Sequence, residues 1–231
     1  MQPVRSVLLA MALMLTSVPA LGMLASTPRA EAHARVGEDL AKKGLSFGSS
    51  VYLRIFKEEA ELEVWLQRGA QYELFKTYRI CAESRTLGPK EKEGDGRSPE
   101  GFYGVTASQL NPRSNYHLAF DIGYPNAYDR SLGRTGSFIM VHGNCVSIGC
   151  FAMTDPVIEE IYLLGEGALA KGQSSFAVHV FPFRMTEENT EQHPNSRWSS
   201  FWSELKAGYD AFEETHVPPD VKVKGGHYVI R

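Results

Sequence analysis

The stretch "SFIMVHGNCVSIGC" (residues 137–150) joins a nearly continuous apolar run to a turn with a histidine, two cysteines and two glycines. A short apolar run bounded by turn residues is consistent with a strand that is buried on both faces. We therefore expect a central strand over 137–142 that ends at His142. A tight turn should then lead to Cys150.

Other runs of similar character indicate a mainly β fold. They are rich in β-branched and aromatic residues and alternate in part between apolar and polar positions, which predicts strands. They cover 51–56, 62–66, 72–80, 117–122 and 176–183. Residues 83–101 contain four glycines and two prolines, so we expect a long ordered loop there, either functional or simply solvated.

Two segments have helical character. Residues 154–165 begin with Thr154 or Asp155 as N-cap, carry Pro156 in the first turn and end at Gly165, which predicts a helix just beyond Cys150. Residues 195–214 carry aromatic side chains at helical spacing, and such a stripe indicates packing against a core.

The N-terminal 34 residues resemble a secretory signal peptide. Arg5 precedes an apolar stretch over 7–24, and small-residue sites allow cleavage after Ala32 or Ala34. An uncleaved membrane anchor is the alternative, because the apolar run is almost long enough to span a bilayer. We expect an exported protein, placed in the periplasm.

Length and charge limit the possible functions. A chain of 231 residues fits one domain with an appendage better than two full domains. Its 24 basic and 27 acidic residues are well mixed and give a net charge of -3, so there is no basic surface for nucleic acid. We expect no nucleic-acid partner.

The three cysteines leave several pairings open. Thiols in an oxidising compartment tend to pair, and an odd number leaves at least one unpaired within the chain. Cys145 can pair with Cys150 across a short loop, or with Cys81 if the fold brings the two together. Zinc binding by His142, Cys145 and Cys150 is a weaker alternative, because their spacing matches no standard finger or ribbon. We expect no metal.

Cys150 has the sequence context of a nucleophile. Gly149 allows a close backbone approach, and His142 ends a rigid strand eight residues earlier, where it can act as base and acid. Ser147 can orient the turn by a hydrogen bond to the backbone, although an ordinary turn serine is equally consistent with the pattern.

Several motifs in order carry a family resemblance. "GDGRSPEGFY" (94–103), "GYPNAYDR" (123–130) and "HGNCVSIGC" (142–150) together are similar to the YkuD-type L,D-transpeptidase catalytic domain. "RIFKEEAELEVW" (54–65), "LGPKEKEGDG" (87–96) and the aromatic C-terminal segment resemble its YafK-like branch more narrowly.

The resemblance implies a mainly β, sandwich-like catalytic domain over 48–183, with a lead-in at 35–47 and a helical C-terminal extension at 184–231. It implies Cys150 as the acyl-accepting nucleophile and His142 as its base, with Gly143 contributing backbone to the setting of the histidine. The implied partner is a peptidoglycan stem peptide, whose acyl group passes to another amine. No cofactor is implied.

Two positions depart from the family pattern. Ile148 replaces the second histidine of Ser-His-Gly-Cys, so His142 must serve alone. Ala152 replaces an arginine that commonly follows the cysteine by two residues and that could pair with a carboxylate. A donor without a free carboxylate, such as a stem peptide joined to a protein through an amide, would suit the missing arginine.

Alternatives therefore remain. A thiol hydrolase of the same fold could cut amides between peptidoglycan and an attached protein, and a non-catalytic wall-binding protein could carry an oxidised or buried Cys150. His117 and His179 lie in expected strands, where a structural role is the more usual one. Asp95, Arg97 and Glu100 in the long loop are candidate substrate contacts, with turn-forming or solvated roles equally consistent.

Overall fold

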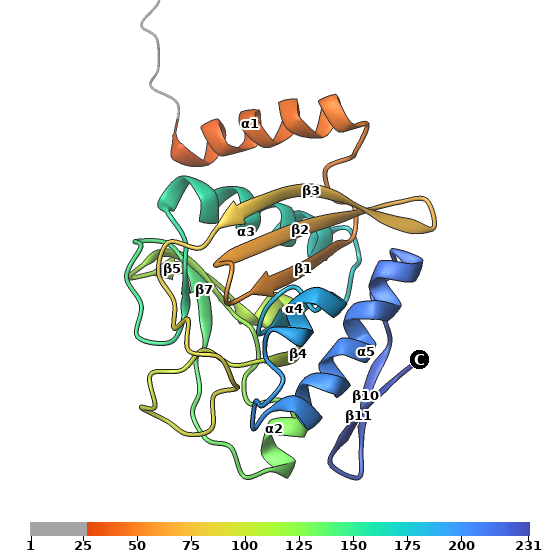
Figure 1. Cartoon of the computed structure of the whole chain (residues 1–231). Helices are drawn as coiled ribbons and strands as arrows, with labels where there is room; N and C mark the ends of the chain where they lie inside the picture. Colours follow the sequence, from red (N-terminus) through yellow and green to blue (C-terminus); the bar gives the residue numbers. More distant parts are fainter. Residues whose placement is uncertain (1–26) are drawn as a thin grey trace, which may run out of the picture.

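The computed structural model describes residues 27–231 (Figure 1). Its helices and strands include α1 (Pro28–Lys43), β1 (Val51–Phe56), β2 (Glu61–Arg68), β3 (Gln71–Arg79), β4 (Gly101–Val105), β5 (Leu110–Ser114), β6 (His117–Asp121), α2 (Ala127–Ser131), β7 (Met140–His142), β8 (Phe151–Ala152), α3 (Asp155–Ala170), β9 (Phe176–Phe181), α4 (Glu187–Glu191), α5 (Ser199–Thr215), β10 (Val221–Lys224) and β11 (His227–Ile230). The fold is mainly β, as the sequence predicts.

Three sheets organise these strands. A five-stranded sheet has the order β3-β2-β1-β9-β4, in which β1 and β9 run parallel. A four-stranded sheet has the order β5-β6-β7-β8, and β10 and β11 form a separate hairpin. The long loop at 83–101 is present, with most of its residues outside helices and strands.

The five-stranded sheet is covered on both faces, which explains why every residue of β1 is buried. Val51, Leu53 and Ile55 join one core together with α3 and the four-stranded sheet. Phe56 belongs to a second core with aromatic residues of α5. Because side chains alternate between the faces of a strand, one short apolar segment contributes to both cores. Figure 1 shows α3 and α5 against this sheet.

The expected central strand is shorter than the sequence predicts. Only Met140–His142 form β7, and the segment before it leaves the sheet. Phe138 has a positive φ of 54° and is 73% exposed, so the backbone turns there instead of extending. The apolar run at 137–142 is therefore only in part a buried strand.

The expected end of the third helix is also wrong. Helix α3 passes through Gly165 and continues to Ala170. A Cβ at position 165 would lie 2.9 Å from the Phe176 ring, so the missing side chain allows the helix to approach β9. This glycine serves close packing and does not end the helix.

Helix α1 begins inside the segment that the sequence assigns to a leader. Thr27 caps it, and Ala32, Val36 and Leu40 are buried. Most of the predicted leader, residues 1–26, lies outside the described residues, so its cleavage stays a prediction. Within residues 27–231, none of the helices combines the length and apolar character needed to cross a membrane.

Candidate active site

A cleft of about 510 Å³ lies on the face of the four-stranded sheet that is turned away from the core. Its floor contains alternate residues of neighbouring strands, and loops close its sides. The lining residues are Asn111, Ser114, Asn115, Tyr116, Ala119, Phe138, Met140, His142, Val146, Ser147, Ile148 and Cys150.

The register of two short strands brings His142 and Cys150 to this cleft. β7 and β8 run parallel and pair Val141 with Phe151, both fully buried in the core. Residues one position away from this pair face the opposite side of the sheet. The fold therefore presents the imidazole and the thiol on one face of the sheet, from two neighbouring segments of the chain.

His142 is held by the backbone of the next residue. Its Nδ1 lies 2.6 Å from the carbonyl oxygen of Gly143, and a carbonyl can only accept, so Nδ1 carries the proton. In the neutral ring, Nε2 is then the unprotonated nitrogen. Tyr116 packs on the ring with 4.8 Å between centroids. Burial lowers the pKa of His142, which favours the neutral form of the ring that acts as a base.

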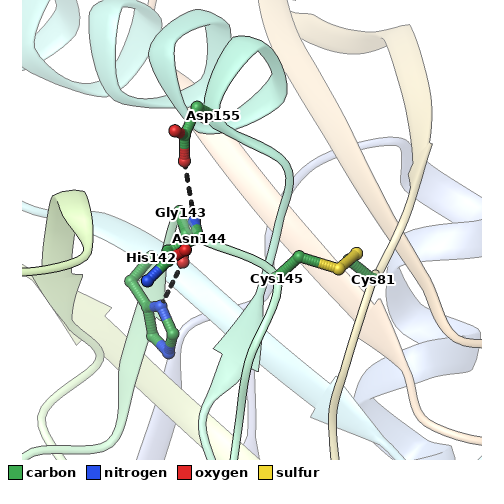
Figure 2. Close-up of a disulfide and its surroundings, with 6 residues drawn as sticks. All are labelled: Cys81, His142, Gly143, Asn144, Cys145 and Asp155. Atoms are coloured by element: carbon green, nitrogen blue, oxygen red, sulfur yellow. Dashed lines mark hydrogen bonds between the residues drawn. A yellow bond between two sulfur atoms is a disulfide. The ribbon is translucent and has the colours of Figure 1, made fainter.

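The segment after His142 is fixed by helix α3. Asp155, in its first turn, accepts a hydrogen bond from the Asn144 amide at 2.7 Å (Figure 2). Gly143 lies so close to this carboxylate and to the carbonyl of Tyr116 that a Cβ would come within 2.6 and 3.0 Å of them. The first turn of α3 therefore anchors the segment that follows His142.

A disulfide joins Cys81 to Cys145, with 5.2 Å between the Cα atoms. Figure 2 shows the disulfide and the His142 ring on opposite sides of the intervening backbone. The amide of Cys81 also donates to the carbonyl of Ala152, so the two segments are linked twice. The bond removes Cys145 from any set of zinc ligands and leaves Cys150 as the free cysteine of residues 27–231.

Cys150 is partly exposed at the edge of the cleft. The backbone amide of Met140 donates to its Sγ at 3.4 Å, and this contact orients the thiol. Burial raises the pKa of Cys150, and the Met140 amide offsets that rise only in part. The resting site therefore pairs a neutral thiol with a neutral imidazole.

The turn before Cys150 is closed by Ser147. Its hydroxyl donates to the carbonyl of Cys150 at 2.7 Å and accepts from the amide of Gly149 at 3.0 Å. Gly149 has a φ of 138°, and a Cβ there would lie 3.2 Å from the Arg97 carbonyl. Gly149 therefore allows the turn before Cys150 to lie close to the backbone of the long loop.

The long loop borders the site through its backbone, while its predicted contact side chains have other partners. Glu100 is fully buried and binds Lys57 Nζ at 2.9 Å, so its prediction as a substrate contact is wrong. Asp95 accepts from Lys90 and from three loop amides; burial raises its pKa, but these bonds outweigh burial and lower it to about 2. Arg97 donates to the Leu87 carbonyl and lines a different hollow.

The other strand histidines do not line the cleft. His117 lies 2.7 Å from Glu159, beside a separate apolar hollow. His179 is enclosed between the five-stranded sheet and α5, where its Nδ1 lies 2.8 Å from the Tyr52 hydroxyl. Both therefore have structural partners.

Tyr116 and Phe138 were not expected at the site, and Ile148 was expected there only as the replacement of a histidine in the family motif. Each of the three lines the cleft. Tyr116 lies in a polar segment without strand or helix periodicity, and its contact with His142 depends on the pairing of β6 with β7. For Phe138 and Ile148, the available signal was their place in the same short stretch as His142 and Cys150.

The chain has similar known proteins. The family model described as the L,D-transpeptidase catalytic domain, YkuD, matches residues 51–166. The chain is 51% identical over 183 residues to the "Putative L,D-transpeptidase YafK" of Escherichia coli K12, an alignment that covers 79% of this chain and 74% of the relative.

Solved structures give more distant likenesses. The helical cell shape determining protein Pgp2 from Campylobacter jejuni matches with a TM-score of 0.45 and 18% identity, over 83% of this chain and 81% of that one. Bd1075 from Bdellovibrio bacteriovorus matches with a TM-score of 0.42 and 19% identity, over 78% of each. The family assignment rests on the sequence matches: the chain belongs to the YkuD L,D-transpeptidase catalytic domain family.

Proposed function

We propose that the protein is an exported peptidoglycan L,D-transpeptidase in which Cys150 is the nucleophile and His142 the general base and acid. The observation that carries this proposal is the register of β7 and β8, which presents both side chains on one face of the sheet at the cleft. Membership of the L,D-transpeptidase family supports a stem peptide of peptidoglycan as the substrate.

The first half-reaction forms a thioester. Sγ of Cys150 attacks the carbonyl carbon of an L-centre that is linked to a D-residue, while Nε2 of His142 takes the thiol proton. The carbon–nitrogen bond then breaks, and His142 returns the proton to the leaving amine. The Gly143 carbonyl, bound to Nδ1, holds the ring in the tautomer that this step needs.

The second half-reaction releases the enzyme. An acceptor amine attacks the thioester carbonyl, gives a proton to His142, and forms a new amide as the carbon–sulfur bond breaks. The cysteine sulfur leaves and recovers its proton. The same two residues therefore serve both halves, and water in place of the amine would give hydrolysis.

The neutral resting pair fits this scheme. Because burial raises the thiol pKa and lowers that of the imidazole, proton transfer accompanies attack instead of preceding it. Cys150 directly precedes β8, so it lies diagonally across from His142 in β7, roughly 8 Å away at the backbone by standard strand geometry. Both side chains line the same cleft.

Hydrolysis of an amide between peptidoglycan and a protein is the second candidate. Large apolar side chains are exposed around the cleft: Ile148 is 95%, Phe138 73%, Val146 54% and Tyr116 46% exposed. Exposed apolar side chains grouped at one place suit a partner with an apolar surface, such as a protein attached to the wall. A wall-binding protein without catalysis is less well supported, because Cys150 is free and reaches the cleft.

The test uses purified protein, its Cys150→Ala variant and isolated cell-wall sacculi, with products read by mass spectrometry. We expect an acyl-enzyme on Cys150 and new or exchanged amide bonds that the variant cannot make. Released protein or shortened stems without new amides would favour the hydrolase. Full activity of the variant would contradict the nucleophile assignment.

A further inference from the structure

A single peptide group connects His142 to a carboxylate. Its carbonyl, that of Gly143, lies 2.6 Å from Nδ1 of His142. Its amide, that of Asn144, donates to Oδ1 of Asp155 at 2.7 Å. Figure 2 shows both hydrogen bonds, with the peptide group between the imidazole and the carboxylate. A continuous chain of hydrogen bonds therefore runs from the first turn of α3 to the ring of His142.

The surrounding backbone fixes the orientation of this peptide group. Asn144 and Cys145 have positive φ angles of 66° and 47°, a left-handed conformation that residues other than glycine seldom adopt. Such a conformation persists where its surroundings over-determine it. On one side the Gly143 amide donates to the Tyr116 carbonyl at 3.0 Å. On the other side the Cys145 amide donates to the Met153 carbonyl at 3.1 Å, and the disulfide holds the Cys145 side chain.

The glycine beside the histidine keeps the carboxylate in place. A Cβ at position 143 would lie 2.6 Å from Oδ1 of Asp155, the oxygen that accepts from the Asn144 amide. A side chain there would therefore push the carboxylate away from that amide. The missing side chain thus serves the contact between the peptide group and Asp155.

The chain of hydrogen bonds matters when His142 becomes charged. In the proposed reaction Nε2 takes the thiol proton, and the ring keeps the proton on Nδ1 that faces the Gly143 carbonyl. Burial lowers the pKa of His142, and the bond to Gly143 opposes that fall. Hydrogen bonds in a chain polarise one another, so a carboxylate at the amide end of a peptide group makes its carbonyl a stronger acceptor.

From this geometry we infer that Asp155 is a positioning residue for His142: acting through the Gly143–Asn144 peptide group, its carboxylate strengthens the bond at Nδ1 and stabilises the charged ring. The inference deepens the proposed function and rests on it, because the ring becomes charged when it takes the proton of Cys150. Asp155 neither receives that proton nor touches the reacting atoms. In serine hydrolases a carboxylate bound directly to the histidine has the corresponding role.

Asp155→Asn separates the charge from the hydrogen bond, because the amide oxygen can still accept from Asn144. The histidine rings are titrated by NMR, and His142→Gln assigns the His142 signals. The pKa of His142 should fall by about 0.2 to 0.5 pH unit, as expected when cooperativity changes a charge-assisted bond by roughly 10 to 30%. The signal of the Nδ1 proton should move upfield, since its bond is weaker. An unchanged pKa would overturn the inference.

Acylation tests Asp155 in the reaction itself. With sacculi as substrate, Asp155→Asn should form the acyl-enzyme about two- to threefold more slowly, and the acid limb of its pH profile should move down with the pKa of His142. A slower rate with the acid limb unmoved would indicate a merely structural role and would overturn the inference. Thermal unfolding of the same samples shows whether the start of α3 is intact.

Glu188→Gln is the matched control. It removes the same charge from the exposed first turn of another helix, α4. Its His142 pKa, acylation rate and acid limb should equal those of the wild type. A fall in the His142 pKa as large as that in Asp155→Asn would mean that net charge, and not the peptide group, sets the effect.

High salt separates action through the peptide group from a direct effect of charge through solvent. Asp155 is exposed, and at about 1 M salt the Debye length is about 3 Å, so an effect through solvent is largely screened. The pKa difference between wild type and Asp155→Asn should persist there, and its loss would overturn the inference. The NMR titration needs no substrate. A pKa difference in a protein that forms no acyl-enzyme would therefore support the role of Asp155 and contradict the proposed function alone.

Discussion

His142 and His179 are both buried, one in the four-stranded and one in the five-stranded sheet, but their rings have different surroundings. His142 in β7 and His179 in β9 are each 3% exposed, and burial lowers the pKa of both. His179 is enclosed by Tyr52, Phe102 and Phe181, whereas the ring of His142 lines a cleft shared with a free thiol. Burial and the direction of the pKa shift therefore do not distinguish the proposed catalytic histidine from the structural one. What distinguishes them is whether the ring borders a cleft.

The largest expected effect lies at His142. His142→Gln should lower the rate of acyl-enzyme formation about 10²- to 10⁴-fold, the range for loss of general acid–base catalysis. The thermal midpoint should change little, because the ring bonds only to the neighbouring backbone and faces the cleft. Mass-spectrometric acylation rates and thermal unfolding of the same samples check both parts. A near-normal rate would require another base.

The disulfide should affect the cleft region more than the His179 region. Replacing Cys81 and Cys145 together by serine opens a loop with a sequence separation of 64 residues. The chain-entropy account gives a loss of about 4 kcal/mol as an upper figure. Acylation should also slow, because Cys145 lies three residues after His142. Urea unfolding and acylation by the folded fraction measure the two effects, and unchanged stability would count against this account.

The comparison also marks what the sequence could predict. Strand runs such as 51–56 and the order of His142, Ser147 and Cys150 are local signals, and the expected strands and turn follow from them. Phe138 belongs to an apolar run but adopts a left-handed conformation, which composition does not reveal. The local sequence pattern does not predict that turn.

Long-range pairing accounts for the remaining differences. Glu100 looks like a solvated loop residue until Lys57, 43 positions away, is placed against it. Glu83 is brought to the turn before Cys150 by the pairing of Ala82 with Ala152 and by the disulfide of Cys81. Charge pairs and hollows built across such distances have no periodicity that a single sequence could display, so they appear only in the folded chain.

Substitution of His179 should lower stability and leave acylation unchanged, the opposite of what is expected for His142. His179→Leu leaves the Tyr52 hydroxyl without its partner in the aromatic core, at an expected cost of about 1–3 kcal/mol. Adding Tyr52→Phe should recover part of that loss, since both polar groups are then absent. The folded fraction should acylate normally. Denaturant unfolding of the two single variants and the double variant measures the coupling, and additive losses would contradict the proposed bond.

The effects of pH separate the two histidines again. Burial and the positive charge of Arg54 lower the pKa of His179 to about 3, so from the usual 6.5 down to that value the unfolded chain binds more protons than the native one. Stability should therefore fall as the pH falls through this window, and less steeply in His179→Leu.

Acylation should depend on His142 instead, with an acid limb centred below pH 6.5 because burial lowers its pKa. That limb should be the same in His179→Leu and wild type, as measured by initial acylation rates and urea unfolding between pH 4 and 8, roughly the range in which histidines titrate. An acid limb that moved with the His179 substitution would mean that the two sheets are coupled and that the division of roles is wrong.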